Sequence, residues 1–285
     1  MAKTIGNPLT WTAQQLGATG DHIAATTAEI GGDGTAADPV INDLTMGDIR
    51  AALRAGWSDF LACRADAVTA ILIYPIAGLV LMGFGLHMNL LPLLFPLMAG
   101  FAILGPVAAV GLYEISRRRE AGEDVNWLAA FDVIRSPSFG AVVVLGIYLA
   151  ALFIGWMLCA NAVYAVTLGP EPPVSLPAFL SDVLTTGAGW TMIILGVAVG
   201  FVFALVALAM SVVSFPLLLD RHVGVPVAVI TSIRVTRQNP REVLAWGAIV
   251  AAALVIGTLP LLLGLIVALP VLGHASWHFY RRAIS

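Results

Sequence analysis

Long runs of apolar residues constrain this chain more than any other feature. A helix needs about 20 mostly apolar residues to cross a bilayer, and residues 65–86, 90–116, 139–166 and 190–219 each meet that requirement. A fifth apolar segment covers residues 243–280. Hydrophobic residues make up 59% of the chain and charged residues only 11%, against about 45–50% and about 25% in soluble domains. The sequence therefore predicts an all-α, polytopic membrane protein and excludes a soluble enzyme.

The segment 243–280 is too long for one spanning helix and short for two. A turn at Thr258-Leu259-Pro260 would divide it into spans 243–259 and 261–280. All 14 Lys and Arg residues would then lie on one side of the membrane, in agreement with the enrichment of cations in cytoplasmic loops. We therefore expect six transmembrane helices within residues 47–285, with both termini in the cytoplasm.

Residues 1–46 are rich in Ala, Thr, Gly and Asp and lack the basic start and apolar run of a signal peptide. This composition predicts a flexible cytoplasmic tail. Apolar residues between Leu9 and Ile30 also recur at a spacing of four and three. A weak amphipathic helix that docks on a partner, or on the rest of the chain, is therefore the alternative.

Three short amphipathic segments precede the three predicted hairpins, at residues 48–63, 126–135 and 226–239. In the first, Ile49 and Trp57 share an apolar face. A helix with such a face lies in the headgroup layer and fixes where the next span enters the membrane. The alternative is that these are ordinary helical loops.

The even-numbered spans carry a further sign of repetition. Tyr113 and Arg117 follow Pro106 at the same offsets at which Trp277 and Arg281 follow Pro270. Together with the amphipathic segments, this pattern predicts three repeated units, each an interfacial helix plus a transmembrane hairpin.

Small residues at every fourth position mark candidate helix-packing sites. Span 190–219 carries Gly196, Gly200 and Ala204, and span 90–116 carries Gly105 and Ala109. Because lipid tails are as apolar as leucine, close packing drives membrane helices together. We expect these positions to pack within the bundle, and an oligomer interface is the alternative.

Aromatic and basic side chains at the ends of spans are candidate interfacial anchors, since they favour the headgroup level. These residues are Trp57, Trp127, Trp277, Arg117 and Arg281.

Glu114 lies one turn before Arg117, and the spacing predicts a salt bridge near the cytoplasmic end of span 90–116.

Ionisable residues inside a membrane are the first place to look for chemistry, and His274 and His278 lie four apart on one face of the last span. The pair could ligate haem or a metal, or pack at the interface beside Trp277. A metal site needs three or four ligands, so we expect no metal and no cofactor.

Phosphate-binding loops, HExxH motifs and GxSxG motifs are absent from the sequence, and the net charge of −3 argues against nucleic acid.

Several strings resemble a known family. They are Asp48 to Leu53, Gly56 to Phe60, Gly105-Pro106, Gly111 to Arg118, and Leu269 to Arg281. In combination they resemble a proteobacterial family of predicted integral membrane proteins without assigned function, some of whose members carry the label of a cytochrome c oxidase subunit. The resemblance covers about residue 40 to the C-terminus and implies the bacterial inner membrane. It supplies no catalytic residues, and five histidines in all are too few for an oxidase core subunit.

Three functions remain open. The first, which we favour, is a non-catalytic scaffold or accessory subunit whose partners are the lipid bilayer and a larger inner-membrane complex. The second is a small transporter, channel or lipid-handling protein with a cavity between the spans. The third is a haem-binding protein that uses His274 and His278. The cavity of the second would be lined by Asn161, Ser211, Ser214, Thr258 and His274.

Overall fold

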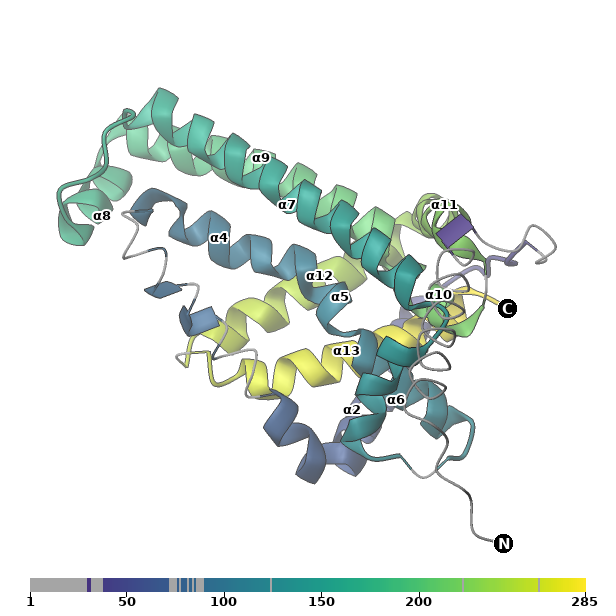
Figure 1. The fold of residues 1–285 in the computed structure, drawn as a ribbon. Coiled ribbons are helices and arrows are strands. Elements are labelled where there is room, and N and C mark those ends of the chain that lie inside the picture. Colours follow the sequence, from purple (N-terminus) through teal and green to yellow (C-terminus); the bar gives the residue numbers. More distant parts are fainter. Residues whose placement is uncertain are drawn as a thin grey trace, which may run out of the picture.

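The computed structural model describes residues 30–31, 38–71, 76, 78–80, 82–83, 85, 90–123, 125–221, 223–260 and 262–285. Over this part of the chain the fold is a bundle of helices (Figure 1). One isolated antiparallel bridge, between Ile41 and Ile284, is the β-type pairing found there. The expected all-α class is confirmed.

Four helical stretches among the described residues are long and apolar enough to cross a membrane. They are Leu91–Glu120, Phe139–Thr167, Gly187–Asp220 and Pro240–Thr258. These stretches coincide with the second to fifth predicted spans, and their ends differ from the predicted ones by a few residues.

The first of these stretches is a chain of short helices. It consists of η1 (Leu91–Leu93), α4 (Leu94–Phe101), η2 (Ala102–Leu104), α5 (Gly105–Ala108) and α6 (Val110–Glu120). Pro106 occupies the first turn of α5. Because proline cannot donate the backbone hydrogen bond of a continuous helix, the helix breaks into a tighter turn just before it.

The next two stretches run side by side as α7 (Phe139–Thr167) and α9 (Gly187–Ser211) (Figure 1). The short helix α8 (Leu176–Thr185) joins them, and Ser175 caps its first turn. A break after Ser211 separates α9 from α10 (Ser214–Asp220). Pro216 stands just beyond that break, so proline again marks the interruption.

The last stretch, α12 (Pro240–Thr258), forms a hairpin with α13 (Leu265–Ala283). The turn is longer than the predicted Thr258-Leu259-Pro260, because α13 begins only at Leu265. Gly257 and Gly264 let the two helix ends meet: a Cβ on Gly264 would lie 2.7 Å from Gly257 Cα. The hairpin is confirmed, but α13 is not among the four stretches that qualify as spans by length and composition.

The helix α2 (Met46–Ile71) is continuous across the predicted junction between an interfacial helix at 48–63 and a span at 65–86. Most of the predicted span beyond Ile71 lies outside the described residues. α2 packs along α13, where Phe60 contacts Ile266 and Val271. Ile49 of α2 is also buried, whereas Trp57 points outward with 47% of its surface exposed.

The other two amphipathic segments form helices where the sequence predicts them. The helix η3 (Trp127–Arg135) begins at Asn126, whose side chain accepts a hydrogen bond from the amide of Leu128. The second, α11 (Gly224–Gln238), buries one face. Each leaves apolar side chains exposed, among them Phe131, Ile134, Ile230 and Ile233. Outward-facing apolar residues are typical of helices that lie in the headgroup layer, and the equivalence of three repeated units stays a prediction.

The chain enters and leaves the bundle at the same end. Beside the Ile41–Ile284 bridge, the amide of Asn42 donates to Ala283 O at 2.9 Å, and the amide of Leu44 donates to the Asn239 side chain at 2.7 Å. Residues 38–45 of the predicted tail are thus bound to the bundle; residues 1–29 and 32–37 of that tail lie outside the described residues. Figure 1 shows the C-terminus, α10 and α11 at this end and α8 at the other.

Candidate functional site

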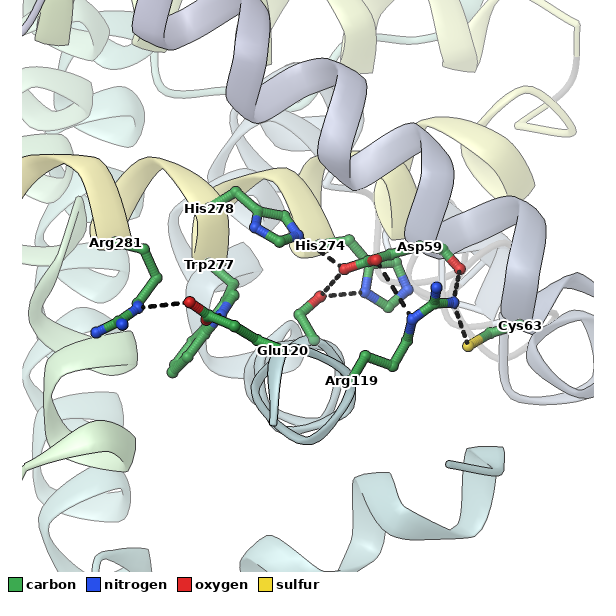
Figure 2. Close-up of polar contacts among 9 residues, drawn as sticks. Asp59, Cys63, Arg119, Glu120, His274, Trp277, His278 and Arg281 are labelled. Carbon is green, nitrogen blue, oxygen red and sulfur yellow. Dashed lines mark hydrogen bonds and ion pairs between the residues drawn. The ribbon is translucent and has the colours of Figure 1, made fainter. Parts of the chain in front are cut away.

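Three helices, α2, α6 and α13, approach one another closely at the end of the bundle that holds both described chain ends. Gly56 of α2 lies against Ala275, and Gly273 of α13 lies against Leu112 of α6. Small residues at these crossings bring polar side chains from all three helices within hydrogen-bond reach. Figure 2 shows the resulting polar cluster. Its members are Asp59, Cys63, Ser116, Arg119, Glu120, His274, Trp277, His278 and Arg281.

Asp59 is the centre of this polar cluster. Its Oδ2 atom accepts hydrogen bonds from Ser116 Oγ at 2.7 Å and from His278 Nε2 at 2.8 Å. Arg119 places its Nε atom 3.4 Å from Asp59 Oδ1 and also donates to the Asp59 carbonyl and to Cys63 Sγ. One carboxylate of α2 therefore ties α6 and α13 together.

The hydrogen bonds fix the tautomer of His274. Ser116 Oγ lies 2.8 Å from His274 Nδ1, and the single hydroxyl proton of Ser116 is donated to Asp59. His274 must then carry its proton on Nδ1 and donate it to Ser116 Oγ. This leaves His274 Nε2 as a buried atom for which the described residues offer no hydrogen-bond partner.

The charge of Asp59 is largely withdrawn from water, since only 10% of its side chain is exposed. Burial alone would raise the pKa of Asp59. The hydrogen bonds from His278 and Ser116 outweigh burial and hold this pKa below its ordinary value. Asp59 is accordingly a carboxylate whose charge is stabilised by the surrounding helices.

A second group of contacts extends the polar cluster toward α10. Glu120, at the end of α6, accepts from Trp277 Nε1 at 2.8 Å and from Arg281 Nε at 3.0 Å. Asp220, at the end of α10, accepts from the Tyr280 hydroxyl and lies 3.5 Å from Arg281 Nη1. The ends of α6, α10 and α13, which are the ends of the even-numbered predicted spans, therefore meet around Arg281.

The predicted salt bridge of Glu114 is confirmed. Arg117 binds both carboxylate oxygens of Glu114 at 2.8 Å, and Arg118 Nε binds one of them at 2.6 Å. Arg118 also reaches Asp132 of η3 at 3.0 Å. These contacts fasten η3 to the end of α6.

The two histidines lie together, as their spacing predicts, but each already uses one ring nitrogen within the protein. His278 Nε2 binds Asp59, and His274 Nδ1 binds Ser116. Among the described residues, no three His, Cys, Asp or Glu side chains gather around one metal position. Because the histidines share one face of one helix, they cannot bind opposite sides of a single haem iron.

The candidate packing positions divide into two kinds. A Cβ on Gly200 would lie 2.8 Å from the Trp156 ring of α7, and Ala109 packs against the core. Gly196 and Gly105 have open space where a Cβ would be, and Ala204 is exposed. Internal packing at these last three positions stays a prediction.

Most of the candidate anchors stand at the cluster end of the bundle. Trp57 is exposed, and Arg117 and Arg281 are partly exposed in their ion pairs. For Trp277 the structure corrects the prediction of an interfacial anchor. Only 1% of its surface is exposed, and its indole group donates a hydrogen bond to Glu120 rather than facing headgroups. The side chain of Trp127 lies outside the described part of the structure.

The residues of the alternative transport cavity are dispersed. Asn161 lines a pocket of about 150 Å³ at the α8 end of α7. The hydroxyl groups of Ser211, Ser214 and Thr258 donate to backbone carbonyls nearby. His274 lies in the polar cluster on α13.

Asp59, Ser116 and Glu120 were not predicted from the sequence as members of a site. A signal was present in α2, where Ala52, Gly56 and Asp59 are spaced by four and three residues and thus share one face. Small residues on that face permit close packing, and a carboxylate among them needs partners on the neighbouring helix.

The fold and the four apolar stretches define a helical integral membrane protein. Residues 94–220 match the model of a family described as a predicted integral membrane protein (DUF2189). This match confirms the expected resemblance to a family of predicted integral membrane proteins over residues 94–220, while the proteobacterial origin and the oxidase label stay predictions. No curated protein and no solved structure matches the chain. The matched segment runs from α4 to α10 and includes Ser116, Arg119 and Glu120 of the polar cluster.

Proposed function

We propose that the protein is a non-catalytic scaffold or accessory subunit of a bacterial inner-membrane complex, with a respiratory oxidase as the complex to test first. The observation that carries this proposal is that the side chains of the polar cluster form hydrogen bonds with one another across helices. Asp59, Ser116 and Glu120 each bind side chains of neighbouring helices. Such contacts hold helices in place, because they join side chains of α2, α6 and α13.

The proposed topology has six transmembrane helices, with α2 leading into the first and α13 forming the last. The Ile41–Ile284 bridge supports this proposal, because a chain that enters and leaves at one end crosses an even number of times. Arg117, Arg135, Arg234 and Arg281 belong to helices that end or lie at this end. The cation-rich end is expected to face the cytoplasm.

Affinity purification in mild detergent, followed by mass spectrometry, tests the scaffold role. The tag belongs at the N-terminus, because a C-terminal tag would lie next to Ile284, which is buried and paired with Ile41. We expect membrane proteins to co-purify in a fixed stoichiometry. Oxidase subunits among them would identify the complex.

The matched control is the same tagged chain purified in a detergent that separates subunits. Partners must disappear from that sample if the association is specific. Recovery of a lone chain in mild detergent from freshly solubilised membranes, with no co-purifying protein above the control, would contradict the scaffold role.

A further inference from the structure

An apolar groove lies between α5–α6 and α7, and its volume is about 540 Å³. Every residue that lines it is apolar. Val107 and Gly111 form one wall, Gly146 and Ala150 of α7 form the other, and Ile134 of η3 also lines the groove. The side chains of the groove therefore offer packing surface but no hydrogen-bonding group.

The groove has the depth of one leaflet. It follows α7 from Phe139 to Ala150, a rise of roughly 16 Å at 1.5 Å per residue. The hydrocarbon core of a bilayer is about 30 Å thick. A chain lying in this groove would thus start at the interfacial helix η3 and end near the middle of the membrane.

A cation stands at the headgroup end of the groove. Arg135 is the last residue of η3, directly after Ile134, and it is exposed. Among the described residues no carboxylate pairs with Arg135, whereas Arg118 on the neighbouring helix is bound to Glu114 and Asp132. An exposed arginine at headgroup level attracts anionic lipid.

We propose that this groove binds one anionic phospholipid, with an acyl chain between α5–α6 and α7 and the phosphate at Arg135. A spanning helix of a partner needs about 20 residues to cross the membrane, whereas the groove lines α7 only from Phe139 to Ala150. An acyl chain ends at mid-membrane, as the groove does. The proposal is independent of the scaffold role, since a structural lipid can accompany any function.

The test uses the full chain reconstituted in vesicles of equal parts phosphatidylglycerol and phosphatidylcholine. After extraction into detergent, native mass spectrometry counts the lipid that each protein retains. We expect one retained phosphatidylglycerol per chain and at least a tenfold preference over phosphatidylcholine. Loss of all lipid on extraction, or equal retention of both lipids, would overturn the proposal.

Two variants fill the groove. Val143→Phe adds a ring at a lining position that is 41% exposed, and its matched control is Val197→Phe on α9, which is 58% exposed and outside the groove. We expect Val143→Phe to lose the retained lipid and Val197→Phe to keep it. Gly146→Leu is the second filling variant, because a Cβ there lies 3.5 Å from Val107 and further atoms extend into the groove.

The headgroup contact is tested separately. Arg135→Gln is expected to bring the preference for phosphatidylglycerol down to less than twofold, and the control Arg237→Gln, at an exposed arginine of α11, is expected to leave it unchanged. Each variant is first shown to be monodisperse and to unfold near the wild-type temperature. Wild-type retention in both folded filling variants, or an unchanged preference in Arg135→Gln, would refute the assigned site.

Discussion

Gly56 of α2 lies directly against Ala275 of α13. A Cβ on Gly56 would come within 2.5 Å of the Ala275 amide nitrogen and 2.6 Å of its Cβ. The obstruction includes backbone atoms, which cannot rotate away as the tip of a flexible side chain can. This crossing sets the distance between α2 and α13, and the hydrogen bonds of Asp59 to Ser116 and His278 depend on it.

Gly56→Ala is therefore expected to destabilise the protein by about 1–3 kcal/mol, the usual range for overpacking. Gly196→Ala is the matched control, because nothing lies within 4 Å of a Cβ at that position of α9. Thermal unfolding of both purified variants measures the difference. Equal unfolding temperatures for the two variants would show that α2 and α13 do not pack this closely.

The polar cluster predicts that removal of the Asp59 carboxylate strongly lowers the stability of the protein. Asp59→Ala removes the negative charge that Arg119 and His278 face and leaves Ser116 without its acceptor. Loss of one member of a buried charged network costs about 3–5 kcal/mol. Ser58→Ala, at the exposed neighbour of Asp59, is expected to cost less than about 0.5 kcal/mol. Denaturant unfolding in one detergent compares the variants, and a cost for Asp59→Ala near that of Ser58→Ala would remove Asp59 from the centre of the cluster.

The sequence predicts the helices well where a single physical rule decides. Apolar length identifies α7, α9 and α12, and the prolines mark the breaks before α5 and near α10. The i, i+3 and i, i+4 spacing of Glu114 with Arg117 and Arg118 predicts their ion pairs, because both partners lie on one helix. Such local rules need no knowledge of how helices pack.

The polar cluster could not be predicted in the same way. Asp59 and His278 are 219 positions apart, and their contact depends on which helices become neighbours. The same reason explains Trp277: its position near the end of α13 suggests an anchor, but the packing of α6 against α13 buries it beside Glu120. Residues 38–45 were predicted to belong to the flexible tail because their partners, Asn239 and the C-terminus, are distant in the sequence.

The shared location of the chain ends predicts a specific labelling pattern. With Cys63 and Cys159 replaced by Ala, single cysteines are placed at Val174, which is 99% exposed in the loop before α8, and at the exposed Ser285. A membrane-impermeant thiol reagent added to cells with an opened outer membrane should label Val174→Cys. Ser285→Cys should react only once the inner membrane is also opened, because both described ends lie at the cation-rich side. Labelling of Ser285→Cys in sealed cells would refute this topology.

The lowered pKa of Asp59 predicts a loss of stability in acid. The unfolded chain returns this carboxyl to its ordinary value of 3.8, above the folded value, so the unfolded state binds a proton first as pH falls. The stabilisation is therefore complete above about pH 5 and disappears as pH falls through the folded pKa. Asp48 also contributes stability that is lost in acid, because a hydrogen bond from the Thr45 side chain lowers the pKa of Asp48.

Unfolding temperatures measured at several values between pH 7 and pH 3 check this prediction. We expect the contribution of Asp59 to be constant above pH 5 and to decline below pH 4. Asp59→Asn should start less stable at pH 7 and decline less steeply in acid, since its amide does not titrate, while Asp48 keeps part of the slope. If Asp59→Asn and the wild type decline in parallel, Asp59 does not contribute to the acid dependence, because a variant without the titrating group must lose that group's share of the slope.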